Sequence, residues 1–323
     1  MPDRVQFPAF AKINLSLDVG DRLADGYHRI DTVMQLISLH DEVTVSLEQT
    51  PAPAGQEVEP SIPPILLTCT DPCLPTGEGN LASQAAALFC RKAGLSDVRV
   101  RIHIKKNIPV GAGLAGGSAD AAAVFHALTL LSGADLRLPD LMKMGEVLGS
   151  DIPFCLVGQA AVLPGLPPNI SKDGLSSTCA RATATGTELS PLLPPASPAL
   201  LPLLLALPAG LSLSTAEAYR CIDETPIALR PDNDRLEQAL RRKRWEDGIP
   251  QMINVFETST FLREPAVGRL KARMRDLLPS ARPVLMSGTG PAVFCFPAAG
   301  CEEEKVVEML QEENYRVFRC HTI

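Results

Sequence analysis

Alternating hydrophobic and polar positions mark several short stretches of this chain. In residues 7–18 the apolar side chains of Ile13, Leu15 and Leu17 occupy every second position, and residues 98–104 repeat this period of two. Such a period is typical of a β-strand with one buried face. Alternation or short apolar runs predict further strands at residues 41–47, 65–69, 199–207, 284–296 (two strands around a glycine turn) and 315–320. Residues 30–39 fit either a strand or a helix.

Helices are expected where apolar residues recur every three or four positions. The clearest one begins after Asn80, a residue type that caps helix N-termini, and ends at Gly94, which suits a left-handed C-terminal position. Further helices are expected at residues 121–131, 139–148, 212–222, 231–245, 255–262, 265–278 and 302–314. Two proline-rich segments, 48–64 and 164–198, have no sustained period, and we expect an exposed loop and a flexible insertion there.

A glycine-rich stretch, IPVGAGLAGGSADAAAV at residues 108–124, joins the strand 98–104 to an alanine-rich helix. Glycines let a ligand approach the backbone closely, and successive backbone N–H groups bind anions. The following helix N-terminus adds unpaired N–H groups and a partial positive charge. We expect a phosphate-binding loop, and the simpler alternative is a glycine turn before a packed helix.

The known phosphate-loop signatures do not fit this stretch well. A Walker A motif requires a lysine directly after its last glycine, and Gly117 is followed by serine. Gly111, Gly113 and Gly116 have the spacing of a dinucleotide-binding fingerprint, but the preceding strand alternates instead of being apolar throughout. A dehydrogenase of the Rossmann type is therefore disfavoured.

Composition narrows the function classes. The 323 residues carry a net charge of −7 and only 4% aromatic residues, which argues against nucleic acid as a partner. Nine dispersed cysteines without a C-x-x-C pair are typical of reduced thiols, and we expect no metal site. The charged start is unlike a secretory signal, and the apolar run 199–207 is too short to cross a membrane. We expect a cytoplasmic protein of bacterial type, or one of a plastid-type organelle if a transit peptide was trimmed.

Several polar residues outside the glycine loop are candidates for chemistry. Lys12 and Asn14 share the face of the first strand opposite its apolar residues, although a lysine there is commonly only solvated. Tyr27 and His28 follow a turn marked by Asp25 and Gly26 and could hold a flat ring or simply fill a loop. Asp151 lies in GSDIPFCL, before what we expect to be an apolar strand, and the local pattern favours a turn cap over a carboxylate directed into a cleft.

Three separated motifs occur in a fixed order: FPAFAKINLSLDVGDRLADGYH, then IPVGAGLAGGSADAAAV with LGSDIPF, then VLMSGTGPAVF. In this order they resemble the GHMP small-molecule kinases, over nearly the whole chain except residues 48–64 and 164–198. The resemblance implies an α+β, two-domain fold with the active site in the cleft between the domains. It implies an N-terminal ATP-binding domain at 1–163, the insertion at 164–198 and a C-terminal domain at 199–323.

The resemblance also implies roles for single residues. Asp151 matches the catalytic aspartate, and Lys12 its partner. The implied ATP contacts are Asn80, Lys106, Pro109, Gly111, Ala112, Gly113, Leu114, Ala115, Gly116, Gly117, Ser118 and Ala119. The implied substrate contacts are Asn14, Tyr27, His28, Asp151, Thr215, Tyr219, Ser287, Gly288, Thr289 and Gly290. Among these, Tyr27, His28 and Tyr219 match residues that hold a cytosine ring. ATP and Mg²⁺ are the implied cofactors, no metal ligand is assigned, and a monomer or a homodimer is expected.

The chain departs from the family pattern at two positions. Ala115 and Ala119 stand where many members have glycine and serine. We expect from Ala115 that this position needs no positive φ, and from Ala119 that Ser118 remains as the loop's side-chain ligand for phosphate or Mg²⁺. A mevalonate- or homoserine-type kinase and a catalytically silent nucleotide-binding sensor stay open as alternatives.

Overall fold

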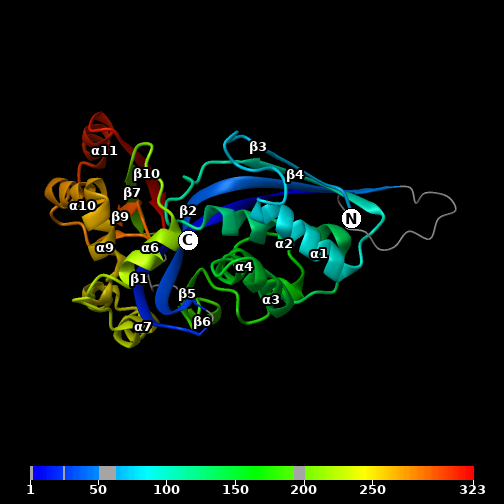
Figure 1. The fold of residues 1–323 in the computed structure, drawn as a ribbon, viewed down its shortest axis with the longest axis horizontal. Helices are drawn as coiled ribbons and strands as arrows, with labels where there is room; N and C mark the ends of the chain where they lie inside the picture. The colour runs from blue at the N-terminus through cyan, green and yellow to red at the C-terminus, as the bar shows by residue number, and fades with distance from the viewer. Residues whose placement is uncertain (1–2, 25, 51–62, 193–200) are drawn as a thin grey trace. The chain divides into compact units, whose positions relative to one another are not determined.

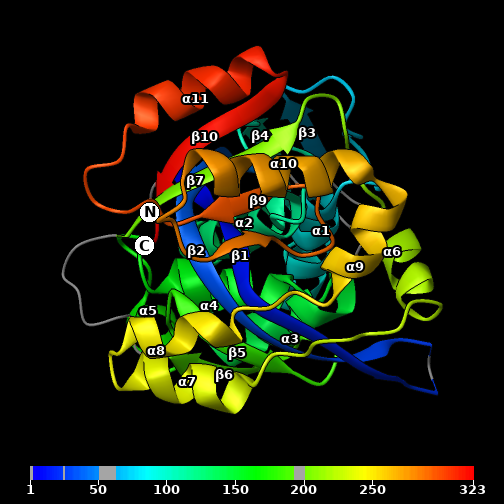
Figure 2. The same ribbon diagram turned by 90° about the vertical axis from the view of Figure 1, so that its left-hand side faces the viewer.

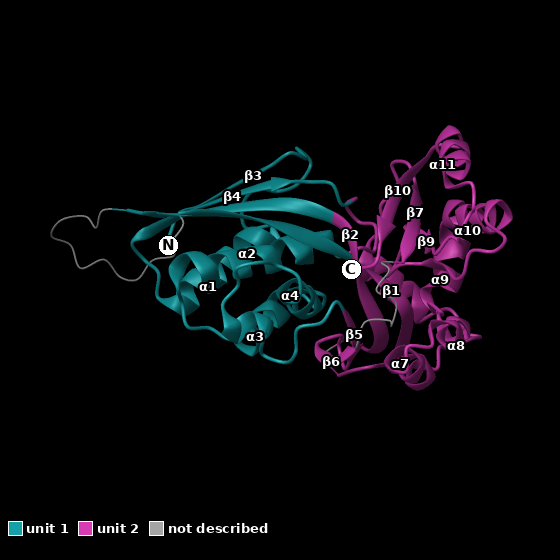
Figure 3. Ribbon diagram, turned by 180° about the vertical axis from the view of Figure 1, so that it is seen from behind, with its two compact units in different colours: residues 1–11, 40–108, 115–178 teal, residues 12–39, 109–114, 179–323 magenta. Residues whose placement is uncertain are grey.

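The computed structural model describes residues 3–24, 26–50, 63–192 and 201–323. Contacts between Cα atoms group the chain into two compact units (Figure 3). Unit 1 comprises residues 1–11, 40–108 and 115–178, and unit 2 comprises residues 12–39, 109–114 and 179–323. Because a contact grouping is not a division into domains, the domains 1–163 and 199–323 stay a prediction.

Unit 1 contains a sheet with helices on one face (Figure 1). Strand β3 (Ile65–Cys69) runs parallel to β4 (Val98–Lys105), and β4 pairs antiparallel with the second half of β2 (His28–Gln49). The helices are α1 (Leu81–Ala93), α2 (Gly116–Ser132), α3 (Leu138–Leu148), α4 (Ile152–Ala160) and the short α5 (Pro168–Ser171). Helix α2 contacts α1, α3 and α4 and is buried on nearly all sides, because its alanines allow close approach.

Unit 2 contains an antiparallel sheet in the order β10-β7-β9-β8. Its strands are β7 (Pro202–Pro208), β8 (Val284–Met286), β9 (Val293–Cys295) and β10 (Tyr315–His321). Helix α10 (Pro265–Leu277) packs against β7, β8 and β9, and α11 (Glu303–Glu312) packs against β10 (Figure 2). Two further helices, α6 (Thr215–Ile222) and α9 (Phe256–Arg263), pack against each other.

A second group of strands in unit 2 carries part of the candidate site. The first half of β2 pairs with β5 (Cys179–Thr183), which pairs with β6 (Glu188–Leu192). Strand β1 (Arg4–Arg22) also pairs with β2. The remaining elements are α7 (Asn233–Arg241), α8 (Trp245–Gly248) and a 3₁₀ turn (Ile249–Gln251).

The predicted helices and all but one of the predicted strands are confirmed, and residues 30–39 are strand. Residues 199–200 of the strand predicted at 199–207 lie outside the described residues. The strand predicted after Asp151 is wrong, because residues 152–160 form α4. This stretch is buried throughout, and an all-apolar run does not distinguish a buried helix from a buried strand.

The prediction of a loop without regular structure at 164–198 is wrong for residues 164–192, which contain α5, β5 and β6. The strands form because β5 pairs with β2, a partner that is distant in the sequence. Residues 193–198 of the predicted insertion lie outside the described residues. So do residues 51–62 of the loop predicted at 48–64.

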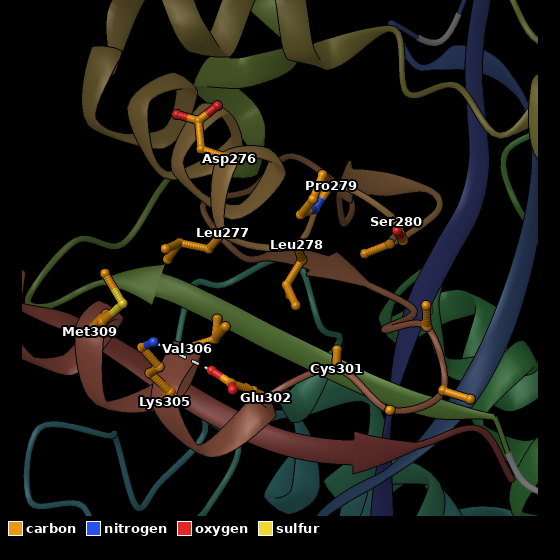
Figure 4. Close-up of a pocket in the computed structure, with 14 residues that line it drawn as sticks. Asp276, Leu277, Leu278, Pro279, Ser280, Cys301, Glu302, Lys305, Val306 and Met309 are labelled. Carbon is orange, nitrogen blue, oxygen red and sulfur yellow. Dashed lines mark ion pairs between the residues drawn. The ribbon is translucent and has the colours of Figure 1, made fainter.

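A hollow of about 560 Å³ lies in unit 2 beside α11 and the C-terminal end of α10 (Figure 4). Lys305 and Glu302, both on its wall, form an ion pair at 3.4 Å. None of the residues implied as ATP or substrate contacts lines it. Within the described residues, no helix is long and apolar enough to cross a membrane.

Candidate active site

The glycine-rich loop connects β4 to α2, with residues 109–114 grouped in unit 2 and Ala115 onward in unit 1. Gly113 has a φ of 75°, and a Cβ atom there would lie 2.2 Å from the carbonyl oxygen of Ser287. The Ser287 hydroxyl donates a hydrogen bond to the Gly113 carbonyl oxygen at 3.0 Å. Only glycine therefore fits at this contact, where the SGTG turn at residues 287–290 meets the loop.

Ala115 corrects one expectation. It has a φ of 57° and a ψ of 32°, the left-handed conformation, directly before α2. Non-glycine residues adopt this conformation at some cost, so the prediction that this position needs no positive φ is wrong. Ala119 is fully buried, and its carbonyl oxygen accepts a hydrogen bond from Gln159 Nε2 at 2.9 Å. Its methyl group therefore serves packing within unit 1.

A buried charge cluster supports the loop in unit 1. Lys106 Nζ is 2.9 Å from an oxygen of Asp120, in the first turns of α2, and also hydrogen-bonds Asp41. The other Asp41 oxygen accepts from the backbone N–H groups of Asn107 at 2.6 Å and Ile108 at 2.8 Å. These contacts hold the chain where it leaves β4 for the loop. Burial raises the pKa of the Asp120 carboxyl above its ordinary value, against the opposing charge of Lys106.

Sequence reasoning missed Asp41, although a signal was present. In the predicted strand 41–47, Asp41 occupies the same alternate positions as the apolar Val43, Val45 and Leu47. Residues at i, i+2 and i+4 of a strand share one face, so Asp41 stands at an inward position. A carboxylate on a buried face needs a cation or hydrogen-bond donors, which Lys106 and the loop supply.

Lys12 and Asn14 lie together in unit 2, as predicted, but both are buried. Lys12 Nζ donates to Asn14 Oδ1 at 2.7 Å and lies 3.4 Å from the Gly113 carbonyl oxygen. Asn14 Nδ2 donates to the hydroxyl of Thr32 at 2.8 Å. The alternative of a solvated surface lysine is therefore excluded, because Lys12 is 3% exposed. Its ammonium group is held next to the glycine loop.

The structure brings His28 and Tyr219 together in unit 2. Their rings stack at a centroid distance of 5.4 Å and an angle of 19°, and Tyr219 packs its ring on Phe256. His28 Nε2 is 2.7 Å from Asp223, which sequence reasoning missed because it lies 195 positions away. Tyr27 is 68% exposed. The placement of a cytosine ring between Tyr27 and Tyr219 stays a proposal.

Two further predicted contacts lie in the same unit. The hydroxyl oxygens of Thr215, at the start of α6, and Thr289, in the SGTG turn, are 3.5 Å apart. Thr215 and Tyr219 lie one turn apart on α6. Residues from α6 and from the SGTG turn therefore meet at one place in unit 2.

Asp151 and Asn80 precede helices of unit 1. Asp151 stands at the N-cap position of α4, but its side chain makes no capping hydrogen bond, so the interpretation as a cap is wrong. Asn80 does cap α1: its Oδ1 accepts from the backbone of Ala82 at 2.9 Å, while its Nδ2 donates to the Pro75 carbonyl oxygen. Asn80 therefore has a structural role, and its contact with ATP stays a proposal.

Comparisons with known proteins show which kinase family this chain is similar to. The family model for the GHMP kinases N terminal domain matches residues 80–159, which contain the glycine loop and Asp151. A 4-diphosphocytidyl-2-C-methyl-D-erythritol kinase of Caldicellulosiruptor saccharolyticus is 34% identical over 88% of this chain and 86% of its own length. The corresponding kinase of Alkaliphilus metalliredigens is 35% identical over 90% and 87%. The chain belongs to the 4-diphosphocytidyl-2-C-methyl-D-erythritol kinase family.

Solved structures agree with this family. A crystal structure of 4-(cytidine 5'-diphospho)-2C-methyl-D-erythritol kinase is 30% identical, with a TM-score of 0.70 over 98% of this chain and 99% of its own. A homoserine kinase from Cytophaga hutchinsonii shares the fold at 18% identity and a TM-score of 0.66. Members of the 4-diphosphocytidyl-2-C-methyl-D-erythritol kinase family are GHMP kinases, so the α+β fold and the kinase class are confirmed.

Proposed function

We propose that this protein transfers the γ-phosphoryl group of ATP to the C2 hydroxyl of 4-diphosphocytidyl-2-C-methyl-D-erythritol, in the non-mevalonate (MEP) route to isoprenoid precursors. The observation that carries the proposal is the similarity to kinases named for this substrate, at 34% and 35% identity over most of the chain. The AKINL, DGYH and GSDIPF segments that point to this substrate are all present.

In this proposal Asp151 and Lys12 act on the hydroxyl group. A tertiary alcohol is a weak acid, so a carboxylate that accepts its proton during transfer lowers the barrier. The Lys12 ammonium stabilises negative charge that develops on the attacking oxygen. The bond from the hydroxyl oxygen to the γ-phosphorus forms as the bond to the leaving ADP oxygen breaks, and the hydroxyl proton passes to Asp151.

The residues of the glycine loop fit a triphosphate. Gly117, which is exposed, and Ser118, which is half-buried, lie in the first turn of α2. The N-terminus of this helix carries a partial positive charge. The backbone N–H groups of both residues and the Ser118 hydroxyl are the donors proposed for the β- and γ-phosphates. Lys106 is proposed on the adenosine side, where its charge is already balanced by two carboxylates.

Mg²⁺ is proposed as the metal that neutralises charge between the β- and γ-phosphates. The Ser118 hydroxyl is the loop side chain that could bind it. In the part of the chain that the structure describes, no three His, Cys, Asp or Glu side chains form a metal-binding group. The proposed ion would be held mainly by phosphate oxygens and water, since Mg²⁺ commonly uses few protein ligands.

We expect Tyr219→Ala to raise KM for the cytidylyl substrate about 5–150-fold, because base stacking on an aromatic ring contributes about 1–3 kcal/mol. Steady-state kinetics with each substrate varied in turn measures this effect. KM for ATP should not change. Tyr219→Phe keeps the ring that stacks on His28 and should retain a KM close to that of the unaltered protein. An unchanged KM in Tyr219→Ala would remove Tyr219 from the cytosine site.

The function itself is tested by ADP release with Mg-ATP and 4-diphosphocytidyl-2-C-methyl-D-erythritol, with mevalonate and homoserine as separate acceptors. Turnover with only the cytidylyl substrate is the expected result. Turnover with mevalonate or homoserine alone would reject the proposed acceptor and keep the kinase class. Binding of ATP without turnover of any acceptor would reject the proposal in favour of a nucleotide-binding sensor.

A further inference from the structure

A buried chain of hydrogen bonds in unit 2 ends on the Lys12 ammonium group. Lys12 donates to Asn14 at 2.7 Å, Asn14 donates to the Thr32 hydroxyl at 2.8 Å, and Thr32 donates to the backbone carbonyl oxygen of Ser16 at 2.6 Å. Lys12, Asn14 and Thr32 are each at most 3% exposed. Thr32 lies on β2, whereas the other three residues lie on β1. The contacts of Lys12 therefore depend on a side chain from the neighbouring strand.

The direction of this chain follows from counting protons. A threonine hydroxyl has one proton to donate, and a backbone carbonyl oxygen can only accept. The 2.6 Å contact with the Ser16 carbonyl therefore takes the only proton of the Thr32 hydroxyl. Toward Asn14, Thr32 can then act only as an acceptor. The Asn14 amide must present its NH₂ group to Thr32.

The orientation of the Asn14 amide follows from this. With the NH₂ group directed to Thr32, the amide oxygen faces Lys12. An ammonium group has three donors and no acceptor, so at Asn14 it can bond only to the amide oxygen. With the amide reversed, NH₂ would face the ammonium group and both contacts would be lost. We infer that Thr32 is a positioning residue: its hydroxyl orients the Asn14 amide and thereby holds the Lys12 ammonium where phosphoryl transfer requires it.

The carbonyl that receives the Thr32 proton is itself held in place. The Ser16 hydroxyl donates to Asn233 Oδ1 at 2.6 Å, and Asn233 Nδ2 donates to the Asp31 carbonyl oxygen at 2.9 Å. Asn233, the first residue of α7, thus joins β1 to β2 directly beside Thr32. Arg181 pairs with the Asp31 carboxylate at 2.7 Å and with Glu237 of α7 at 3.0 Å. The relative position of Ser16 and Thr32 is therefore held by hydrogen bonds and ion pairs that do not involve Lys12.

This inference rests on the proposed function for its kinetic test. Thr32→Val keeps the shape of the side chain and removes the hydroxyl, and we expect kcat to fall about 10- to 100-fold with KM for ATP unchanged, because Lys12 is misplaced. Thr32→Ser restores the hydroxyl without the methyl group and should recover most of kcat. If Thr32→Ser were as slow as Thr32→Val, packing and not the hydroxyl would be decisive. A kcat of Thr32→Val within twofold of the unaltered protein would overturn the inference.

Thr129→Val is the matched control. Thr129 is also a buried threonine, and its hydroxyl donates to the Phe125 carbonyl oxygen at 2.8 Å within α2, outside the hydrogen bonds that end on Lys12. We expect its kcat to stay within about twofold, since residues that share no hydrogen-bond partner act independently. A kcat loss in Thr129→Val equal to that of Thr32→Val would show that the loss of any buried threonine hydroxyl slows the enzyme, and would overturn the specific role of Thr32.

Crystal structures separate this inference from the proposed function. In Thr32→Val we expect Lys12 Nζ to lie beyond hydrogen-bond distance of Asn14, whereas Thr32→Ser should keep the 2.7 Å contact. Unaltered positions of both side chains in Thr32→Val would overturn the inference whatever the substrate is. Absence of turnover in the unaltered protein would instead reject the proposed function, and the crystal structures would still decide the role of Thr32.

Discussion

Asp151→Asn lowers kcat by about 10²- to 10⁴-fold if Asp151 accepts the proton of the substrate hydroxyl. The amide has the same shape but cannot take up the proton. Because the Asp151 side chain makes no capping bond to α4, its replacement removes no cap that the helix needs. Because asparagine also nearly matches aspartate in size, we expect the melting temperature and both KM values to remain near those of the unaltered protein. Steady-state kinetics and a thermal unfolding curve measure these quantities together.

Asp140→Asn is the control for this substitution. Asp140 lies in the first turn of α3, where its carboxylate accepts from the backbone N–H of Arg137 at 3.0 Å. It is a second acidic residue at a helix N-terminus of unit 1, and we expect its replacement to leave kcat unchanged. Near-normal turnover in Asp151→Asn would remove Asp151 as the base and leave Lys12 and the phosphate contacts to account for the rate.

Lys106→Met should lower the free energy of unfolding by about 3–5 kcal/mol, the usual cost of removing one partner from a buried ion pair. The Lys106 side chain is 6% exposed, and its partners Asp41 and Asp120 are 0% and 5% exposed. Without the ammonium group, two buried carboxylates face each other. Because protonation removes one of these charges, the loss should be smaller at pH 5 than at pH 8. Urea unfolding at both pH values measures this loss in the free energy of unfolding.

Lys105→Met is the matched control, one position away. The Lys105 side chain is 55% exposed and pairs with Glu42 on the surface at 2.6 Å. Surface ion pairs contribute about 0–1 kcal/mol, so this variant should unfold almost like the unaltered protein. A Lys106→Met variant as stable as Lys105→Met would contradict the view that the cluster of Asp41, Lys106 and Asp120 supports the loop. Adding Asp120→Asn to Lys106→Met should recover part of the lost stability.

Local chemistry in the sequence was sufficient for much of the fold. Asn80 and Gly94 predicted both ends of α1, since a side-chain oxygen before a helix and a left-handed glycine after it act within a few residues. The alternation in residues 98–104 predicted β4, because this period of two also depends only on near neighbours. The order of three motifs predicted the family, which the comparisons confirmed, and it named Lys12 and Asp151 before their surroundings were known.

Only the tertiary structure decided the features that depend on distant partners. Strand β5 forms by pairing with β2, about 150 residues earlier in the chain, and α4 is helical within a packed group of helices. Ala115 lies between Gly113, which contacts the SGTG turn, and the first residue of α2. It takes a positive φ there, although its residue type predicts the opposite.

The sequence by itself determined the elements with strong local periods and caps, the glycine loop and the family of this protein. The tertiary structure decided how the site residues are held: Asp41 by Lys106 at a separation of 65 residues, and His28 by Asp223 at 195. The hydrogen bond between Asn14 and Thr32 likewise joins residues 18 positions apart. Local periods arise from interactions between near neighbours, whereas these hydrogen bonds join residues that only the folded chain brings together, so no local pattern records them.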